Sequence, residues 1–168
     1  MKKLAIMTIG AALGLALPGG VVAQAGNITA TATVNSNFTN GAVQNLAFTA
    51  VNPGTAASVD PVTGTGGTPG FMEFSYNANY RVTATTLPAT LTDGGSSSVT
   101  VAWLCGVSGS TAVNPGSTAS CSQGDTVDSD NAVTGTGTTV VWLGGDIANT
   151  NVLAGTYTGN ITFTISAF

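Results

Sequence analysis

The chain has 168 residues, of which 6% are charged and none is histidine, and its formal net charge at pH 7 is −4. An average soluble domain has about 25% charged residues, so this surface has to be built from neutral polar side chains. One Arg and two Lys cannot neutralise a phosphate backbone, which excludes nucleic-acid binding. With no His, one Glu and two Cys, there is little material for acid–base catalysis or a zinc site, so we expect neither an enzyme nor a cofactor.

Residues 1–25 have the composition of a secretory signal peptide. The three parts of such a leader are a basic start, an apolar stretch and small residues at the cleavage site, and here they are Lys2 and Lys3, residues 4–17, and Ala23 and Ala25. A membrane anchor is the alternative, but the apolar run is shorter than the roughly 20 residues that a span requires, and Pro18 interrupts it. We expect cleavage after Ala25, export, and no membrane span in the remaining chain.

After residue 25 no helical period is found. Apolar residues alternate instead with Thr and Ser, which is typical of half-buried strands, and turn sequences rich in Gly, Asn and Pro separate these runs. The strands expected in chain order are residues 28–34, 43–51, 71–76, 80–87, 99–105, 140–143 and 157–168. This number of short strands predicts an all-β fold, an antiparallel immunoglobulin-like β-sandwich, with residues 37–168 as its single domain.

The two cysteines, Cys105 and Cys121, are expected to form a disulfide. An even pair in an exported protein is usually bonded, and neither a partner His nor a Cys-x-x-Cys spacing supports a metal or redox role. The bond would enclose 15 residues rich in Gly and Ser, which predicts a stapled loop. Trp103 lies two residues before Cys105, in phase with Val101, and we expect it in the core beside the disulfide rather than on a sugar-binding face.

The last predicted strand alternates most regularly. Its apolar face comprises Tyr157, Ile161, Phe163, Ile165 and Ala167, and the chain ends at Phe168. Gly155, in the sequence Ala-Gly-Thr-Tyr-Thr-Gly, is the fourteenth residue from the C-terminus. This arrangement resembles the C-terminal motif of chaperone–usher pilus subunits, which a periplasmic chaperone grips, although that family usually has Tyr as its penultimate residue. Residues 46–88 also resemble a broader group of exported β-sandwich proteins that includes spore-coat-U-like and pilin-like members.

The resemblance gives residues 26–36 two open interpretations. A pilin fold is similar to an immunoglobulin sandwich that lacks one strand, and an N-terminal segment of the next subunit fills the resulting groove by strand addition. The residues of this segment that would be inserted are Ile28, Ala30, Ala32 and Val34. The alternative is that the segment forms the first strand of its own sandwich, and the alternation fits both.

Asp125, Asp128 and Asp130 form the only acidic cluster of the sequence. Oxygen ligands at this spacing could hold Ca²⁺, but the Gly and the distal Glu of an EF-hand loop are missing, so a solvated acidic loop is the preferred interpretation.

Taken together, these features predict a secreted structural subunit of a pilus or fimbria. Its partners would be copies of itself, with a periplasmic chaperone and an outer-membrane usher in transit, and its final location the cell surface. The alternative is a stand-alone secreted module that binds carbohydrate or forms part of a spore coat or surface layer.

Overall fold

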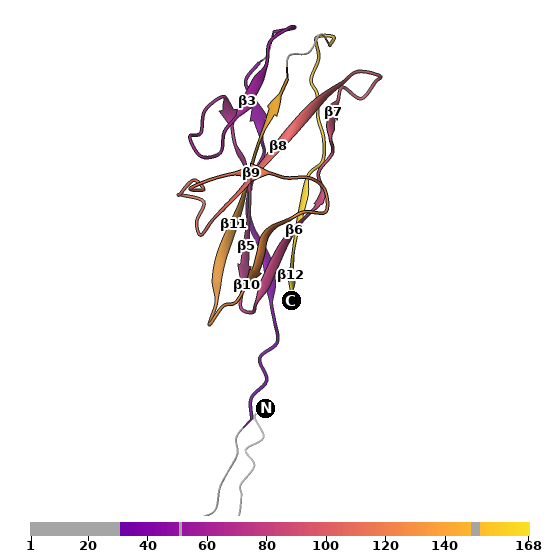
Figure 1. Ribbon diagram of the computed structural model, residues 1–168. Coiled ribbons are helices and arrows are strands. Elements are labelled where there is room, and N and C mark those ends of the chain that lie inside the picture. The colour runs from indigo at the N-terminus through magenta and orange to yellow at the C-terminus, as the bar shows by residue number, and fades with distance from the viewer. Residues whose placement is uncertain (1–30, 51, 149–151) are drawn as a thin grey trace, which may run out of the picture. The chain divides into compact units, whose positions relative to one another are not determined.

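The computed structural model describes residues 31–50, 52–148 and 152–168 (Figure 1). The chain divides into two compact units, Met1–Thr33 and Val34–Phe168. In the first unit the described residues, 31–33, are exposed and belong to no strand. The expected leader, with Ala23 and Ala25, lies outside the described residues, as do Ile28 and Ala30.

The described part of the second unit consists of antiparallel strands and contains no helix. One sheet has the order β1-β5-β11-β8-β7, with β3 added to β11 and β9 to β8; a second sheet has the order β10-β6-β12, and β2 pairs with β4. The strands are β1 (Phe38–Gln44), β2 (Ala47–Phe48), β3 (Ala57–Val59), β4 (Gly67–Thr68), β5 (Gly70–Tyr76), β6 (Tyr80–Thr86), β7 (Thr90–Thr92), β8 (Ser98–Ser108), β9 (Ala119–Ser120), β10 (Thr126–Asn131), β11 (Gly137–Ile147) and β12 (Thr162–Ala167). This confirms the predicted class, an all-β antiparallel sandwich.

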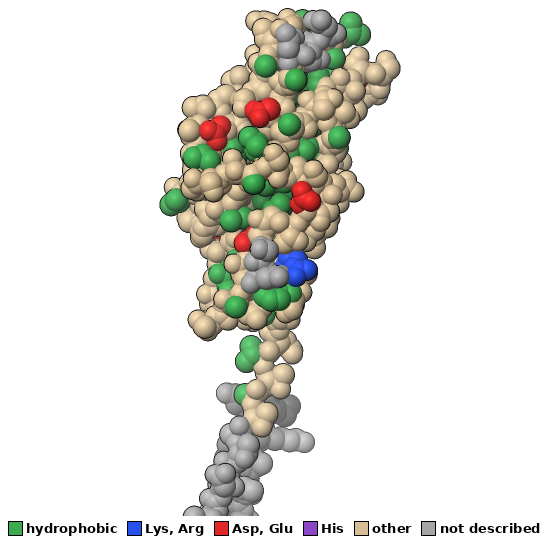
Figure 2. Space-filling view, viewed as in Figure 1, with side chains coloured by type: hydrophobic (Ala, Val, Ile, Leu, Met, Phe, Trp, Pro, Cys, Tyr) green, Lys and Arg blue, Asp and Glu red, His purple; other side chains and the backbone are tan. Residues whose placement is uncertain are grey.

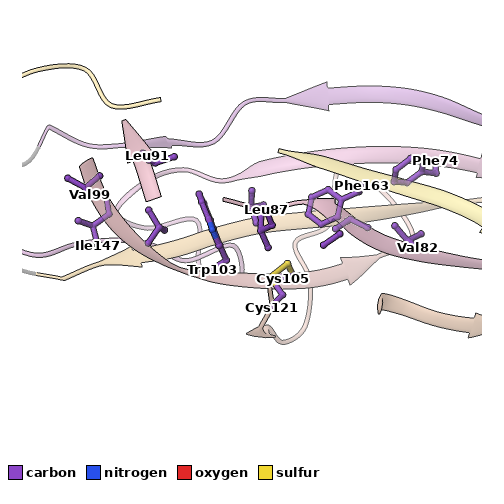
Figure 3. Packing of buried hydrophobic residues seen from close by; sticks show 14 of the residues in the cluster. Phe74, Val82, Leu87, Leu91, Val99, Trp103, Cys105, Cys121, Ile147 and Phe163 are labelled. Atoms are coloured by element: carbon purple, nitrogen blue, oxygen red, sulfur yellow. A yellow bond between two sulfur atoms is a disulfide. The ribbon is translucent and has the colours of Figure 1, made fainter. Parts of the chain in front are cut away.

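The hydrophobic core lies between the two sheets and continues past the smaller one. Alternate residues of β8 are buried, and Val101, Trp103 and Cys105 point to the same side. Figure 3 shows Phe74, Val82 and Phe163 toward one end of the core and Leu91, Val99 and Ile147 at the other. Burial alternates because successive side chains of a strand point to opposite faces of the sheet, and the β-branched and aromatic residues suit this half-buried surface.

The outer face of the larger sheet has its own apolar cover. Trp142 is buried there against Phe71, with ring centroids 5.0 Å apart, and its indole N–H donates to the Ser108 hydroxyl at 2.8 Å. Two loops lie close to the sheet at glycines: a Cβ on Gly144 would be 2.5 Å from Pro61, and one on Gly106 would be 2.8 Å from Pro115. The second of these loops is the segment stapled by the disulfide.

Several predicted elements differ from the observed ones. The acidic segment predicted as a loop is only partly one: Asp125 lies in the exposed turn before β10, whereas Asp128 and Asp130 belong to β10, which pairs with β6. Asp128 also finds a partner inside the sandwich, the hydroxyl of Thr139. The C-terminal strand begins at Thr162 rather than at 157, because the preceding residues turn toward β7 and pair there through Thr158. Residues 31–34 form no strand, and the first strand among the described residues is β1, which starts later, at Phe38.

Candidate functional site

An apolar groove of about 990 Å³ opens at the end of the core where the smaller sheet stops. One side is formed by residues 43–50, which run from the end of β1 through β2, and the other side is formed by residues 152–161. Of the smaller sheet only Phe163 in β12 contributes. The floor consists of core side chains of the larger sheet, namely Leu91, Val99, Trp103, Leu143 and Ile147. None of the lining residues is charged.

Strand β12 forms an edge of the smaller sheet directly beside this groove. It pairs with β6 on one side only, and from Phe163 to Ala167 the register runs without a shift. Phe163 is buried and Ile165 half-buried, whereas Thr162, Thr164 and Ser166 are exposed, as the alternation predicts. The second side of β12 therefore presents a row of backbone N–H and C=O groups that no described strand occupies.

Residues 152–161, which we call the strap, lead into β12 and belong to no strand. The strap is held to β7 by two backbone hydrogen bonds between Thr158 and Thr92, of 2.8 and 3.0 Å. Within it, the Tyr157 hydroxyl donates to the carbonyl of Leu153 at 2.7 Å. Val152, Tyr157 and Ile161 are partly buried and pack against the core.

The described assembly residues predicted from the sequence lie in several different parts of the chain. Gly155, Tyr157 and Ile161 lie in the strap, and Phe163, Ile165 and Ala167 lie in β12. Phe168 is exposed, and its ring lies 5.9 Å from the Arg81 guanidinium carbon. Val34 is 83% exposed, and Ala32 is exposed and lies in no strand. Sequence reasoning missed residues 43–50 as a groove wall, because only the folded chain brings them opposite the strap.

A polar cluster occupies the other end of the sandwich, where it joins the two sheets. The carboxylate of Asp128 in β10 accepts hydrogen bonds from Thr139 at 2.8 Å, Asn131 at 2.6 Å and Tyr80 at 3.2 Å. Burial and the nearby negative charge of Asp128 raise the pKa of Tyr80 to about 12. Among the described residues, no three His, Cys, Asp or Glu side chains gather to hold a metal ion. The cluster therefore joins β6, β10 and β11, and three hydrogen-bond donors stabilise the Asp128 carboxylate.

The predicted disulfide between Cys105 and Cys121 is present, with the Cα atoms 5.8 Å apart. Both sulfurs belong to buried residues of the same core cluster as Trp103, as expected (Figure 3). Just before the second cysteine the chain pairs with β8 as β9, and just after it the chain crosses to the smaller sheet, where Gly124 donates to the carbonyl of Ala84. A buried disulfide at this crossover indicates a protein that folds in an oxidising, exported environment.

Comparisons with protein-family models, with curated proteins and with solved structures found no match to this chain. In the part of the chain that the structure describes, no helix is long and apolar enough to cross a membrane. One face of the protein is dominated by neutral side chains with scattered acidic groups (Figure 2). The groove and the adjacent edge of β12 are the structural features of the described residues that could receive a binding partner.

Proposed function

We propose that this protein is an exported, non-catalytic structural subunit that assembles with copies of itself into a surface pilus or fimbria. Residues 26–36 of one copy would enter the groove of the next by strand addition. The observation that carries the proposal is the position of an uncharged apolar groove against the unpaired, regular edge of β12. Strand addition requires this combination, because the edge pairs with backbone groups while the groove takes alternate side chains.

Strand β12 differs from the other sheet edges among the described strands. In β1 a bulge interrupts the register between Asn40 and Val43, and β10 has two such interruptions. Strand β7 has three residues, and Thr92 is already bonded to the strap. Bulges and short edge strands are the usual ways in which proteins prevent unwanted pairing. Strand β12 also has a register shift, between Thr162 and Phe163, but from Phe163 to Ala167 its edge is regular and lies beside the groove, as strand addition requires.

The segment that precedes β1 is suited to pair with a neighbour. Asn77, at the end of β5 away from the groove, donates to the carbonyl of Asn35 at 3.1 Å and accepts from the backbone N–H of Asn37. Asn77 thus holds residues 35–37 at the end of β5 away from the groove. If the residues before them enter the groove of the next copy, the contact is head-to-tail, which propagates as an open fibre.

While a subunit crosses the periplasm, before a neighbouring subunit has entered its groove, the groove and the β12 edge would need to be covered by another protein. We propose that a periplasmic chaperone provides this cover along residues 155–168 and that an outer-membrane usher exports the subunits to the cell surface. The likeness of the segment around Gly155 to the pilus-subunit motif supports this part of the proposal.

The test places a charge on each face of the donor segment. The full chain carrying Ala32→Asp, on the face expected to enter the groove, should remain monomeric because an unpaired carboxylate is costly in an apolar site. The matched control is Thr33→Asp, which should assemble like wild type. Assembly is measured by size-exclusion chromatography and electron microscopy. Fibres that grow without residues 26–36 contradict the proposal, and a protein that stays monomeric at every concentration favours a stand-alone binding or coat module.

A further inference from the structure

The floor of the groove is already shielded in the isolated subunit. Leu91, Val99, Trp103, Leu143 and Ile147 line the groove, yet each is 8% exposed or less. Apolar side chains facing an empty groove would be open to water, so other parts of the chain must cover them. The strap supplies part of that cover, because Val152, Tyr157 and Ile161 pack against the same cluster.

The paired edge of β12 is too short for the whole donor segment. Six residues in β12 span about 20 Å, whereas the nine residues 27–35 in extended form need about 30 Å. The chain that continues β12 beyond Thr162 is the strap. A donor paired along its full length therefore has to pair with the strap as well, and the strap cannot offer a straight edge while Thr158 is bonded to Thr92.

Weak attachments hold the strap in place. Two backbone hydrogen bonds tie it to β7, and the bond from Tyr157 to Leu153 stays within the strap. Gly159 lies so close to the core that a Cβ there would be 2.8 Å from the Leu91 side chain. Leu153, in the same segment, is 74% exposed. The strap's core contacts are thus accompanied by few hydrogen bonds to the rest of the fold, and segments held by few hydrogen bonds open locally at low cost.

We infer that the strap is a displaceable wall of the groove that covers part of the groove floor until a donor segment from a second copy enters. On entry, the Thr92–Thr158 pair breaks, the strap straightens into an extension of β12, and the donor replaces it over the groove floor. The strap thus sets the rate at which subunits join and protects the apolar floor of the free subunit. This inference rests on the proposed assembly by strand addition.

The test locks the strap with a removable cross-link. The full chain carrying Thr92→Cys with Thr158→Cys joins two residues that pair across the bridge. The matched control, Thr90→Cys with Thr100→Cys, places the same type of cross-link between β7 and β8, where the strap is not involved. The probe is a fluorescent synthetic peptide of residues 26–36 in excess, and its uptake is followed by anisotropy before and after mild reduction.

We expect the oxidised cross-link between positions 92 and 158 to slow peptide uptake at least tenfold relative to the same protein after reduction. The oxidised control variant and wild type should take up peptide within twofold of their rates after reduction. Tyr157→Phe, which keeps the ring and removes the bond to Leu153, should accelerate uptake a few-fold. Equal uptake by the locked and reduced forms overturns the strap inference, whereas a lack of uptake by every form, wild type included, contradicts strand addition itself.

Amide hydrogen exchange of wild type gives a second readout that needs no variant. When the peptide is bound, the amide of Thr92 should lose protection, because its present acceptor is the carbonyl of Thr158. The amides of residues 163–167 that do not donate to β6 should gain protection. Retained protection of the Thr92 amide in the complex overturns the inference, because the strap would then have stayed on β7.

Discussion

The hydroxyl of Thr139 in β11 donates a 2.8 Å hydrogen bond to the Asp128 carboxylate in β10, and this bond connects the two sheets. Thr139 is 3% exposed, so its hydroxyl has little access to water. A carboxylate that accepts from three side chains at one end of the sandwich opposes the apolar groove at the other. At the polar end, this hydrogen bond holds the two sheets together. At the groove end, the strap covers part of the core instead.

Thr139→Val should lower the free energy of unfolding by about 1.5–3 kcal/mol. The shape is retained but a hydrogen bond to a charged acceptor is lost. Urea denaturation measures the change. Thr100→Val, an exposed position on β8, is the control and should change stability by no more than about 0.5 kcal/mol. Equal stability of the two variants would show that the Thr139–Asp128 bond contributes nothing.

Tyr80 should make the protein lose stability as the pH rises above 10. Burial and the Asp128 charge raise the pKa of the folded protein's Tyr80 to about 12, from the ordinary tyrosine value of 10.0. Between these values the folded chain keeps a proton that the unfolded chain has released, so unfolding releases a proton and is favoured by higher pH. Below pH 10 the contribution is fully present. Denaturation at several pH values should show a shallower decline for Tyr80→Phe; equal slopes contradict the assignment.

Runs of apolar and β-branched residues predicted several of the strands, whereas strands that depend on tertiary partners could not be predicted. Strands β5, β8 and β11 contain the predicted runs, and β6 contains all of the run 80–87 except its last residue. In β10 the aspartates indicated a solvated loop, since only the folded chain shows that Asp128 meets Thr139 and Tyr80. In β1 the pair Asn40-Gly41 has the composition of a turn, yet the structure makes it a bulge in an edge strand.

The apolar face of the candidate site could be predicted from the sequence, but the strap and the second wall of the groove could not. The alternation of residues 161–167 predicted a strand with an apolar face, and β12 has Phe163 buried and Ile165 half-buried on that face. Its free edge follows only from the order of the sheet. The same alternation also predicted a strand from Tyr157, because periodicity carries no information about the bond between Thr158 and Thr92. The wall formed by residues 43–50 depends on contacts between distant parts of the chain, which a single sequence does not reveal.

Loss of the disulfide should destabilise the fold by about 3 kcal/mol, the chain-entropy value for a loop of this size. Replacing both Cys105 and Cys121 by Ser tests this in chemical denaturation, and the variant should still give the far-ultraviolet circular dichroism of a β protein. Wild type that has been reduced and alkylated in denaturant, then refolded, should show a similar loss. A variant as stable as wild type would mean that the hydrogen bonds of β9 hold the crossover alone.

Gly66 and Gly94 have the same backbone conformation, φ of +81°, but different surroundings. A Cβ on Gly66 would lie 1.7 Å from the carbonyl oxygen of Ser58, whereas one on Gly94 meets nothing within 4 Å. Gly94→Ala should cost about 1–2 kcal/mol through the left-handed conformation alone. Gly66→Ala should cost about 1–3 kcal/mol more because of the overlap. Thermal unfolding of both variants measures the difference, and equal losses would contradict the close approach at Ser58.

Peptide uptake by the groove should be nearly independent of salt. The groove lining and residues 26–36 contain no Asp, Glu, Lys or Arg, so apolar contact and backbone pairing would drive entry without electrostatic steering. Between about 20 mM and about 500 mM NaCl, the uptake rate of the fluorescent peptide should change less than about twofold, whereas steered association slows steeply with ionic strength. A peptide with Thr33→Lys is the matched control: its charge should be attracted to the acidic protein, so its uptake should slow as salt is added. A wild-type peptide that slows as much as the lysine peptide would show that acidic groups outside the groove guide entry, and that the uncharged lining does not set the rate.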